Sequence, residues 1–141
     1  MVEAAPLNEV ETALYSRLTG TAMLTPLLAT QTSVYHSIAP QGAAYPLVIV
    51  NRQAGSDDNK SPRRARQLLY LVKAVSNKSM KEAGAIDKEI DKALHDQALS
   101  ITGWSNYWLM RETDVQYVEV AEDDRVYYHS GGIYRMRIAH A

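Results

Sequence analysis

The chain of 141 residues contains no cysteine, which excludes disulfide bonds and thiolate chemistry. It also lacks any apolar run near the roughly 18 residues needed to cross a bilayer. The N-terminal stretch MVEAAPLNEVE has neither the basic nor the apolar region of a secretory signal. The formal net charge is only −1, which argues against non-specific nucleic-acid binding by the whole surface. We therefore expect no membrane association and no specific nucleic-acid binding, and the missing cysteines are compatible with a cytosolic protein.

Phenylalanine is absent as well, whereas tyrosine occurs nine times. Tyrosine fills hydrophobic cores, but its hydroxyl group favours a hydrated or interfacial end. This bias is compatible with contact surfaces, although tyrosines at the margin of a sheet core explain it more simply. A chain of this length typically buries about two-thirds of its unfolded surface, which suits one compact domain over residues 1–141.

Two strand-like runs, Tyr45–Gln53 and Arg66–Ser76, predict the centre of a β-sheet. Both carry apolar residues on both faces, as expected for strands that are covered on two sides or buried in an assembly. They are joined by the polar segment Ala54–Ala65, AGSDDNKSPRRA, which we interpret as a long solvated hairpin loop. The two strands then form a scaffold, and the loop is the candidate functional segment.

Residues 6–18 predict a first helix, because apolar residues recur there at helical spacing. Pro6 suits the first turn, where its missing N–H group costs nothing, and Gly20 is placed to end the helix. The apolar stripe of this helix comprises Leu7, Val10, Leu14 and Leu18.

A second helix is predicted to begin after Ser79 and to run to about Ala98. Ser79 and Glu82 have the spacing of a capping box, in which each side chain accepts a hydrogen bond from a free backbone N–H group. Asp87 and Asp91 fall on the polar side of this helix. We interpret these two carboxylates as solvated charge and not as an acid–base pair.

The remaining chain predicts short strands that complete the sheet. Ser130-Gly-Gly132 is a turn signal, and the alternation in Ile133–Ala139 is typical of a half-buried strand antiparallel to the one before it. The other expected strands are Ser33–Ile38, Leu99–Thr102, Trp108–Met110 and Val115–Val120. The order of elements predicts a single α+β domain, with a mainly antiparallel or mixed sheet and helices packed on one face.

No constellation of catalytic residues is evident. The chain has no G-x-S-x-G motif, and its four histidines lack metal-ligand spacing. We expect no catalytic residue, no cofactor and no metal, and hence a protein that is not an enzyme. A small α+β enzyme or ligand-binding domain is the alternative from a different functional class.

Charge is distributed unevenly along the chain. A basic cluster comprises Lys60, Arg63, Arg64 and Arg66, whereas the segment Arg111–Arg125 holds six carboxylates against two arginines. The two regions are complementary across copies of the chain, and head-to-tail contacts of this kind close into rings when the rotation permits. Ordinary surface charge explains the pattern equally well. Nucleic-acid binding by the basic loop is a third option, of modest and salt-sensitive affinity.

Several motifs, taken in order, resemble the tail completion or tail terminator proteins of siphophage-like tails. After a short N-terminal helix, Val34-Tyr35 precedes Ala39-Pro-Gln-Gly-Ala-Ala-Tyr-Pro46, which is the most specific part. A V-I-V strand, a long polar loop, an R-x-R-Q-L strand and a helix with a loose match over Asp87–Leu94 follow. The chain then closes on Gly-Gly-Ile-Tyr-Arg-Met-Arg-Ile. The likeness spans about Leu7 to Ile138.

The resemblance implies a structural virion protein without catalytic residues. It implies a homohexameric ring at the head-proximal end of the tail, assembled in the host cytoplasm, which ends the tube and contacts the tail tube protein and the head–tail connector. DNA passes through such a ring. A head-side neck protein is the alternative within this class. Two segments, Ala54–Ala65 and Ser105–Val126, depart from the family pattern, so their contacts do not transfer. The candidate interface residues are Asp57, Asp58, Lys60, Arg63 and Arg64.

Overall fold

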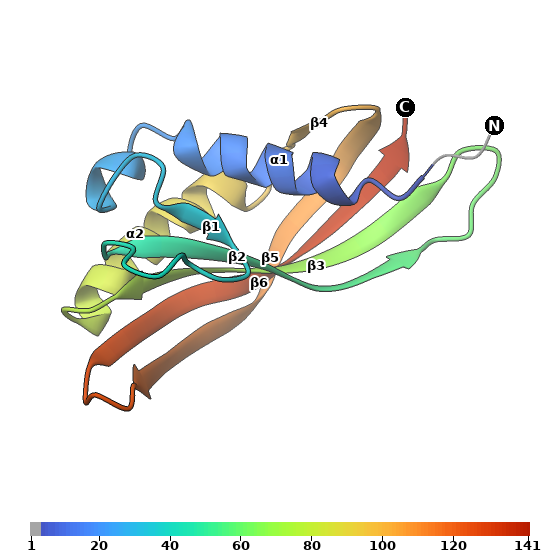
Figure 1. Cartoon of the computed structure of the whole chain (residues 1–141). Coiled ribbons are helices and arrows are strands. Elements are labelled where there is room, and N and C mark those ends of the chain that lie inside the picture. Colours follow the sequence, from blue (N-terminus) through green and yellow to red (C-terminus); the bar gives the residue numbers. More distant parts are fainter. Residues whose placement is uncertain (1–3) are drawn as a thin grey trace.

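The computed structural model describes residues 4–141 as one curled sheet and two α-helices (Figure 1). Residues 1–3, part of the N-terminal stretch considered above, lie outside the described residues. The elements are α1 (Leu7–Thr19), the 3₁₀ turn η1 (Thr25–Leu27), β1 (Val34–His36), β2 (Leu47–Asp57), β3 (Ala65–Ser76), α2 (Met80–Leu94), β4 (Ser100–Ile101), β5 (Trp104–Val120) and β6 (Val126–His140).

The sheet has the strand order β1-β2-β3-β6-β5-β4. All neighbouring strands are antiparallel except β1 and β2, which are parallel. The predicted α+β class, with a mainly antiparallel sheet and helices on one face, is confirmed. The strand pairs that were expected to form the centre, β2 and β3, lie side by side, and β6 completes the middle of the sheet.

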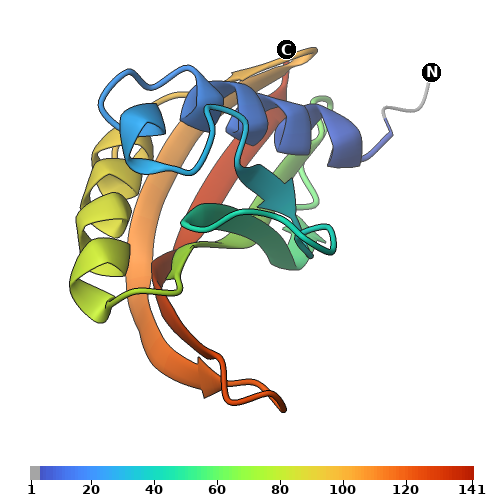
Figure 2. The ribbon, with the colours of Figure 1, turned by 60° about the vertical axis from the view of Figure 1, so that its left-hand side comes forward.

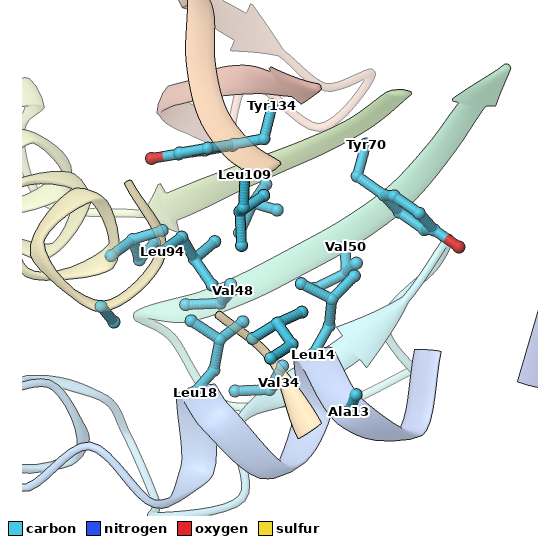
Figure 3. Close-up of a cluster of buried hydrophobic side chains, with 14 of the residues drawn as sticks. Ala13, Leu14, Leu18, Val34, Val48, Val50, Tyr70, Leu94, Leu109 and Tyr134 are labelled. Atoms are coloured by element: carbon cyan, nitrogen blue, oxygen red, sulfur yellow. The ribbon is translucent and has the colours of Figure 1, made fainter. Parts of the chain in front are cut away.

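Both helices pack on the same face of the sheet and enclose the main hydrophobic core (Figure 3). Leu14 and Leu18 of α1 and Leu94 of α2 are at most 1% exposed. They meet the alternate side chains of four strands, among them Val48, Val50, Tyr70, Leu109 and Tyr134. Burial of each large apolar side chain stabilises the fold by roughly 1.5–3 kcal/mol before the cost of chain ordering. The predicted stripe of α1 is confirmed from Val10 onward, but Leu7 is 47% exposed.

The start of α2 confirms one half of the expected capping box. Ser79 Oγ accepts a hydrogen bond from the Glu82 N–H group at 3.1 Å. The Glu82 carboxylate does not reach back to Ser79; it accepts from Ser76 Oγ at 2.6 Å, at the end of β3. The helix ends at Leu94, before the predicted Ala98, because Asp96 takes a positive φ and its N–H group bonds to the carbonyl of Leu109 in β5.

The predicted turn at Ser130-Gly-Gly132 is wrong, because these residues lie inside β6. Gly131 is needed there since a Cβ atom would collide with the Val72 carbonyl and Lys73 of the neighbouring strand. Gly132 leaves the space that the Arg111 side chain fills. The chain instead turns between β5 and β6, where the Ala121 N–H group bonds to the carbonyl of Arg125.

The hairpin loop is shorter than Ala54–Ala65, because β2 continues to Asp57 and β3 begins at Ala65. The residues of 54–57 have low intrinsic strand propensity, but they pair with 66–69 of β3, which supplies the missing order. A register shift between Arg52 and Ala54 allows this extension. The loop therefore comprises residues 58–64.

β5 is continuous from Trp104 to Val120, where the sequence predicted a strand region whose breaks the pattern did not fix. Two register shifts against β6, between Asn106 and Trp108 and between Arg111 and Thr113, account for the disturbed alternation. Such bulges bend a strand and increase its twist. The hairpin of β5 and β6 consequently curves away from the sheet and extends past α2 (Figures 1 and 2).

Candidate assembly surfaces

The loop of residues 58–64 is tied down at its base by the residues that sequence analysis singled out. Arg64 donates to both carboxylate oxygens of Asp57, at 2.6 and 2.9 Å. These hydrogen bonds hold the pKa of the Asp57 carboxyl below its usual range. Asp58 Oδ1 accepts from Gln67 Nε2 at 2.8 Å. Asp57, Asp58 and Arg64 are therefore engaged within the chain, and they shape the loop.

Lys60 and Arg63 are exposed at the tip of the same loop and have no ion-pair partner among residues 4–141. Arg66, the fourth member of the basic cluster, is only 7% exposed. The cationic surface at this end is thus smaller than the sequence suggested. It consists of two side chains that are free to meet another molecule.

The acidic segment lies at the opposite end of the sheet. In the antiparallel register of β3 and β6, Ala65 pairs with Ala139, whereas Ser76 pairs with Tyr128. The turn of residues 121–125 and the loop of residues 58–64 therefore project from opposite ends (Figure 1). The structure does not bring the two charged regions together within one copy, which leaves them available for contacts between copies.

Most charges of the segment 111–125 are paired within the chain. Glu112 accepts from Arg135 at 2.6 Å, Asp114 from Arg111 at 2.9 Å, and Asp123 pairs with Arg125. The Glu112 carboxylate raises the pKa of the Arg135 guanidinium. Glu122 and Asp124, at the turn, are exposed and have no ion-pair partner in the described part of the chain.

The interpretation of Asp87 and Asp91 as solvated charge is wrong, because both belong to a polar cluster between α2 and the β5–β6 hairpin. Arg111 donates to both carboxylate oxygens of Asp87, at 2.8 and 3.0 Å, and to the carbonyl of Gly131 at 2.8 Å. Tyr134 donates to Asp91 at 3.0 Å. Asp87 is 8% exposed. The partners are at least 20 positions apart in sequence, so no local pattern predicted these contacts.

This cluster, Asp87–Arg111–Tyr134, fastens the hairpin to the helix. The hydrogen bonds that Arg111 donates to Asp87 raise the pKa of Arg111, and burial raises the pKa of the Tyr134 hydroxyl. Both groups therefore keep their protons at neutral pH, and the guanidinium remains a donor to five oxygen atoms on α2, β5 and β6. These contacts tie the base of the hairpin to α2, and the tip extends beyond them.

The face of the sheet turned away from both helices is called the open face here. Side chains alternate along β3 and β6, so residues next to core positions fall on this face. They include Leu69 and Leu71 of β3, Ile133 and Arg137 of β6, and, directly across from β6, Met110 and Trp108 of β5. The apolar members form a stripe that is only partly shielded.

One end of the open face is covered by the segment 37–46, which contains the most specific motif of the resemblance. Ala39, Ala43 and Tyr45 pack on a second cluster of buried residues, Leu47, Ile49 and Val75. The Tyr45 ring contacts the Tyr127 ring of β6, with centroids 5.0 Å apart. A cavity of about 370 Å³ remains beside this segment.

The neck of the β5–β6 hairpin, defined as the part around Tyr117 and His129, carries a stacked pair of rings on the open face. The rings of Tyr117 and His129 lie parallel, with centroids 4.3 Å apart, and Lys73 donates to the Tyr117 hydroxyl at 2.6 Å. His129 Nε2 lies 2.8 Å from the Glu119 carboxylate. Burial lowers the pKa of His129, against the opposing effect of Glu119.

Within residues 4–141, no group of three or more potential metal-ligating side chains comes together. No helix in that part of the chain is long and apolar enough to cross a membrane.

Comparisons with known proteins point to one family. The family described as "Tail completion protein gp17" matches residues 12–138. No curated protein matches the chain. Among solved structures, a chain of the "Virion of native gene transfer agent (GTA) particle" has a similar fold, with a TM-score of 0.78 at 17% sequence identity. The alignment covers 97% of this chain and 99% of that chain. At this identity the likeness concerns the fold.

Proposed function

Because the chain belongs to the family of tail completion proteins gp17, which are structural proteins of phage tails, we propose that it forms a ring at the head-proximal end of the tail tube. The ring ends tube polymerisation and joins the tail to the head. The observation that carries this proposal is the family match over residues 12–138. A virion chain of the same fold supports it further.

The charge distribution favours a ring built from head-to-tail contacts. Lys60 and Arg63 project from one end of the sheet, and Glu122 and Asp124 project from the other. Two unlike surfaces on one chain produce heterologous contacts, which close into a ring when the rotation between neighbours permits. The number of subunits implied by the resemblance is six.

The proposed mechanism is occupation of the growing end of the tube. One face of the ring matches the last ring of tube subunits, so no further subunit is added, and the other face meets the head connector. Individually weak contacts suffice, because several copies bind together and gain avidity without strong single sites. Assembly takes place in the host cytoplasm, and DNA passes through the finished ring.

The predicted interface residues retain a part in this proposal. Lys60 and Arg63 make the contact, whereas Asp57, Asp58 and Arg64 hold the loop in the shape that presents them. The hydrogen bonds of Arg64 to Asp57 span the base of the loop, so the tip changes little on binding.

Deletion of the gene, with electron microscopy of the lysate, tests the proposal. Tails longer than normal are expected, because nothing then ends the tube. Normal-length tails detached from filled heads contradict termination and identify a head-side joining protein instead. Complementation with the wild-type gene serves as the control and should restore complete particles.

A further inference from the structure

We propose that, in the ring, the tip of the β5–β6 hairpin of one copy lies on the open face of the next copy. This inference rests on the proposed ring and names the surfaces that build it. The occupant of the open face is therefore a second copy of this chain, and three properties of the molecule support that assignment.

The first property is the exposure of apolar side chains at the hairpin tip. Val118 and Val120 are 53% and 65% exposed. They lie opposite Tyr128 and Val126 of β6, on the side of the hairpin that continues the helix-covered face. α2 does not extend far enough to cover them, because the hairpin projects past it (Figure 2). Two exposed valines on a projecting arm indicate a contact surface.

The second property is the apolar stripe of the open face. Leu71 and Ile133 are paired neighbours in the middle of the sheet. In the adjacent row, Leu69 and Met110 lie on either side of Arg135, whose guanidinium bonds to Glu112 and Gln67. Both helices lie on the other face, and the segment 37–46 covers only the region of Leu47, Ile49 and Val75. No element among residues 4–141 covers the stripe, so valine side chains from outside can pack there.

The third property is a match of charge and spacing. Beyond the stripe, the guanidinium of Arg137 lies over the Trp108 ring and has no carboxylate partner within the described residues. Four positions separate Ile133 from Arg137, which is about 13 Å at the rise of a strand. Glu122 lies in the turn that follows Val120, the last residue of β5, and so lies beyond the two valines along the hairpin. With the valines on the stripe and the hairpin directed along β6, the acidic turn faces Arg137.

The same placement brings the acidic turn towards the cationic loop. Arg137 lies two residues before Ala139, which pairs with Ala65 at the end of the loop of residues 58–64. Lys60 and Arg63 are thus on the same end of the sheet as Arg137. Apolar contact and charge complementarity then act in one interface, with the charges selecting the register.

The absence of cysteine makes a direct test possible by engineered disulfides. The variant L71C/V120C is purified reduced, incubated with tail tubes and then oxidised. A ladder of covalent oligomers that collapses on reduction is expected. A disulfide within one chain is excluded, because Leu71 pairs across β6 with Thr113 and Val120 lies seven residues further along. That separation is about 23 Å, whereas bridged Cα atoms lie within about 7 Å.

Single-cysteine variants sharpen the test. L71C alone and V120C alone should give no dimer, and their mixture should give dimers only, because the contact is heterologous. L71C/M23C is the matched control: Met23 is 69% exposed but lies between α1 and η1, outside the β5–β6 hairpin. Circular dichroism of the reduced variants verifies that each one folds.

The outcomes separate the two proposals. Oligomers of normal mass without the L71C/V120C ladder overturn the hairpin contact and leave the ring intact. An equal ladder from the control also overturns it, because collisions then explain the bonds. A crosslink of L71C to the tube protein assigns the open face to the tube instead. A chain that stays monomeric with tail tubes present contradicts the ring itself.

Discussion

The two hairpins at opposite ends of the sheet are each held by an arginine, but at different points. The β2–β3 hairpin is stabilised near its tip, where Arg64 bonds to Asp57 on the surface. The β5–β6 hairpin is stabilised at its base, where Arg111 is held by Asp87 against α2. One arginine holds each hairpin, and the two pairs contribute unequally to stability, because the side chains of Arg111 and Asp87 are more buried than those of Arg64 and Asp57.

The largest expected effect comes from breaking the buried pair. Arg111→Ala leaves Asp87 without its guanidinium partner in a mostly buried site, and removal of one member of such a pair costs about 3 kcal/mol of unfolding free energy. Urea denaturation followed by circular dichroism measures this loss. Arg64→Ala, which breaks the exposed pair of the other hairpin, is the matched control and should change stability little. Equal losses in the two variants contradict the comparison.

The second effect tests the contact between β3 and β6, the strands through which the two hairpins adjoin. Gly131→Ala places a Cβ atom against the Val72 carbonyl and Lys73, so we expect a loss of about 1–3 kcal/mol from the overpacked β3–β6 contact. Gly84→Ala is the control, because nothing lies within 4 Å of its Cβ position in α2. That change should stabilise the helix by about 0.5–1 kcal/mol. Thermal denaturation of both variants distinguishes the two signs.

A third prediction addresses the free charges at the two tips. K60E/R63E should weaken assembly by roughly tenfold, since two charge pairs of up to about 1 kcal/mol each are lost. E122K/D124K should do the same, and the chain with all four substitutions should regain part of the lost assembly, because the exchanged tips attract each other again while Arg137 still repels the two new lysines. Analytical ultracentrifugation with tail tubes present measures the fraction assembled. If the fourfold variant stays as weak as its parents, the tips do not meet.

The predicted loop contacts are tested in the same assay. Substitution of Asp57, Asp58, Arg63 and Arg64 by alanine should leave the fold intact and impair assembly, because the loop loses both its brace and one free cation. Alanine at Lys81 and Lys88, exposed on α2, provides a control that removes two surface cations outside the hairpins. Unaltered assembly of the fourfold alanine variant removes the loop from the interface.

The smallest effect is a pH dependence in the neck of the β5–β6 hairpin. Burial lowers the pKa of His129 in the folded chain, so the unfolded chain binds a proton more readily. The neutral imidazole stabilises the fold fully above the unfolded pKa near 6.5, and this contribution falls as the pH decreases through that value. Denaturation between pH 7.5 and pH 5 should show a flatter profile for His129→Gln. A steeper profile in that variant contradicts the assignment.

Local patterns predicted most of the fold. Periodicity indicated α1, α2 and the central strands, because one apolar face determines where such elements pack. The glycines of β6 were wrongly assigned to a turn. They are required because Lys73 and Arg111 of neighbouring strands occupy the space beside them. The bulges of β5 misled for the same reason: a shift of register is decided by the partner strand.

The candidate site was predictable only in outline. The charges of residues 57–64 were evident in the sequence, and so was their sign. Which of them are free was not, because this depends on the pairing of Arg64 with Asp57 and on the burial of Arg66. The Asp87–Arg111 contact joins residues 24 positions apart and depends on the assembled sheet. The open face likewise depends on tertiary structure, because it is defined by the packing of both helices on the opposite face of the sheet.

The two bulges in β5 have a consequence for divergence among related proteins. The second bulge directly follows Arg111, which bonds to Asp87 of α2, and its extra residue, Glu112, is exposed and accepts a hydrogen bond from Arg135. Because a bulge bends its strand, a change of one residue beyond Arg111 re-aims the arm while the contact of Arg111 with α2 can remain. The direction of the β5–β6 hairpin can therefore change while the helices and the sheet keep their packing. A protein with this fold could then contact a different partner without an added domain.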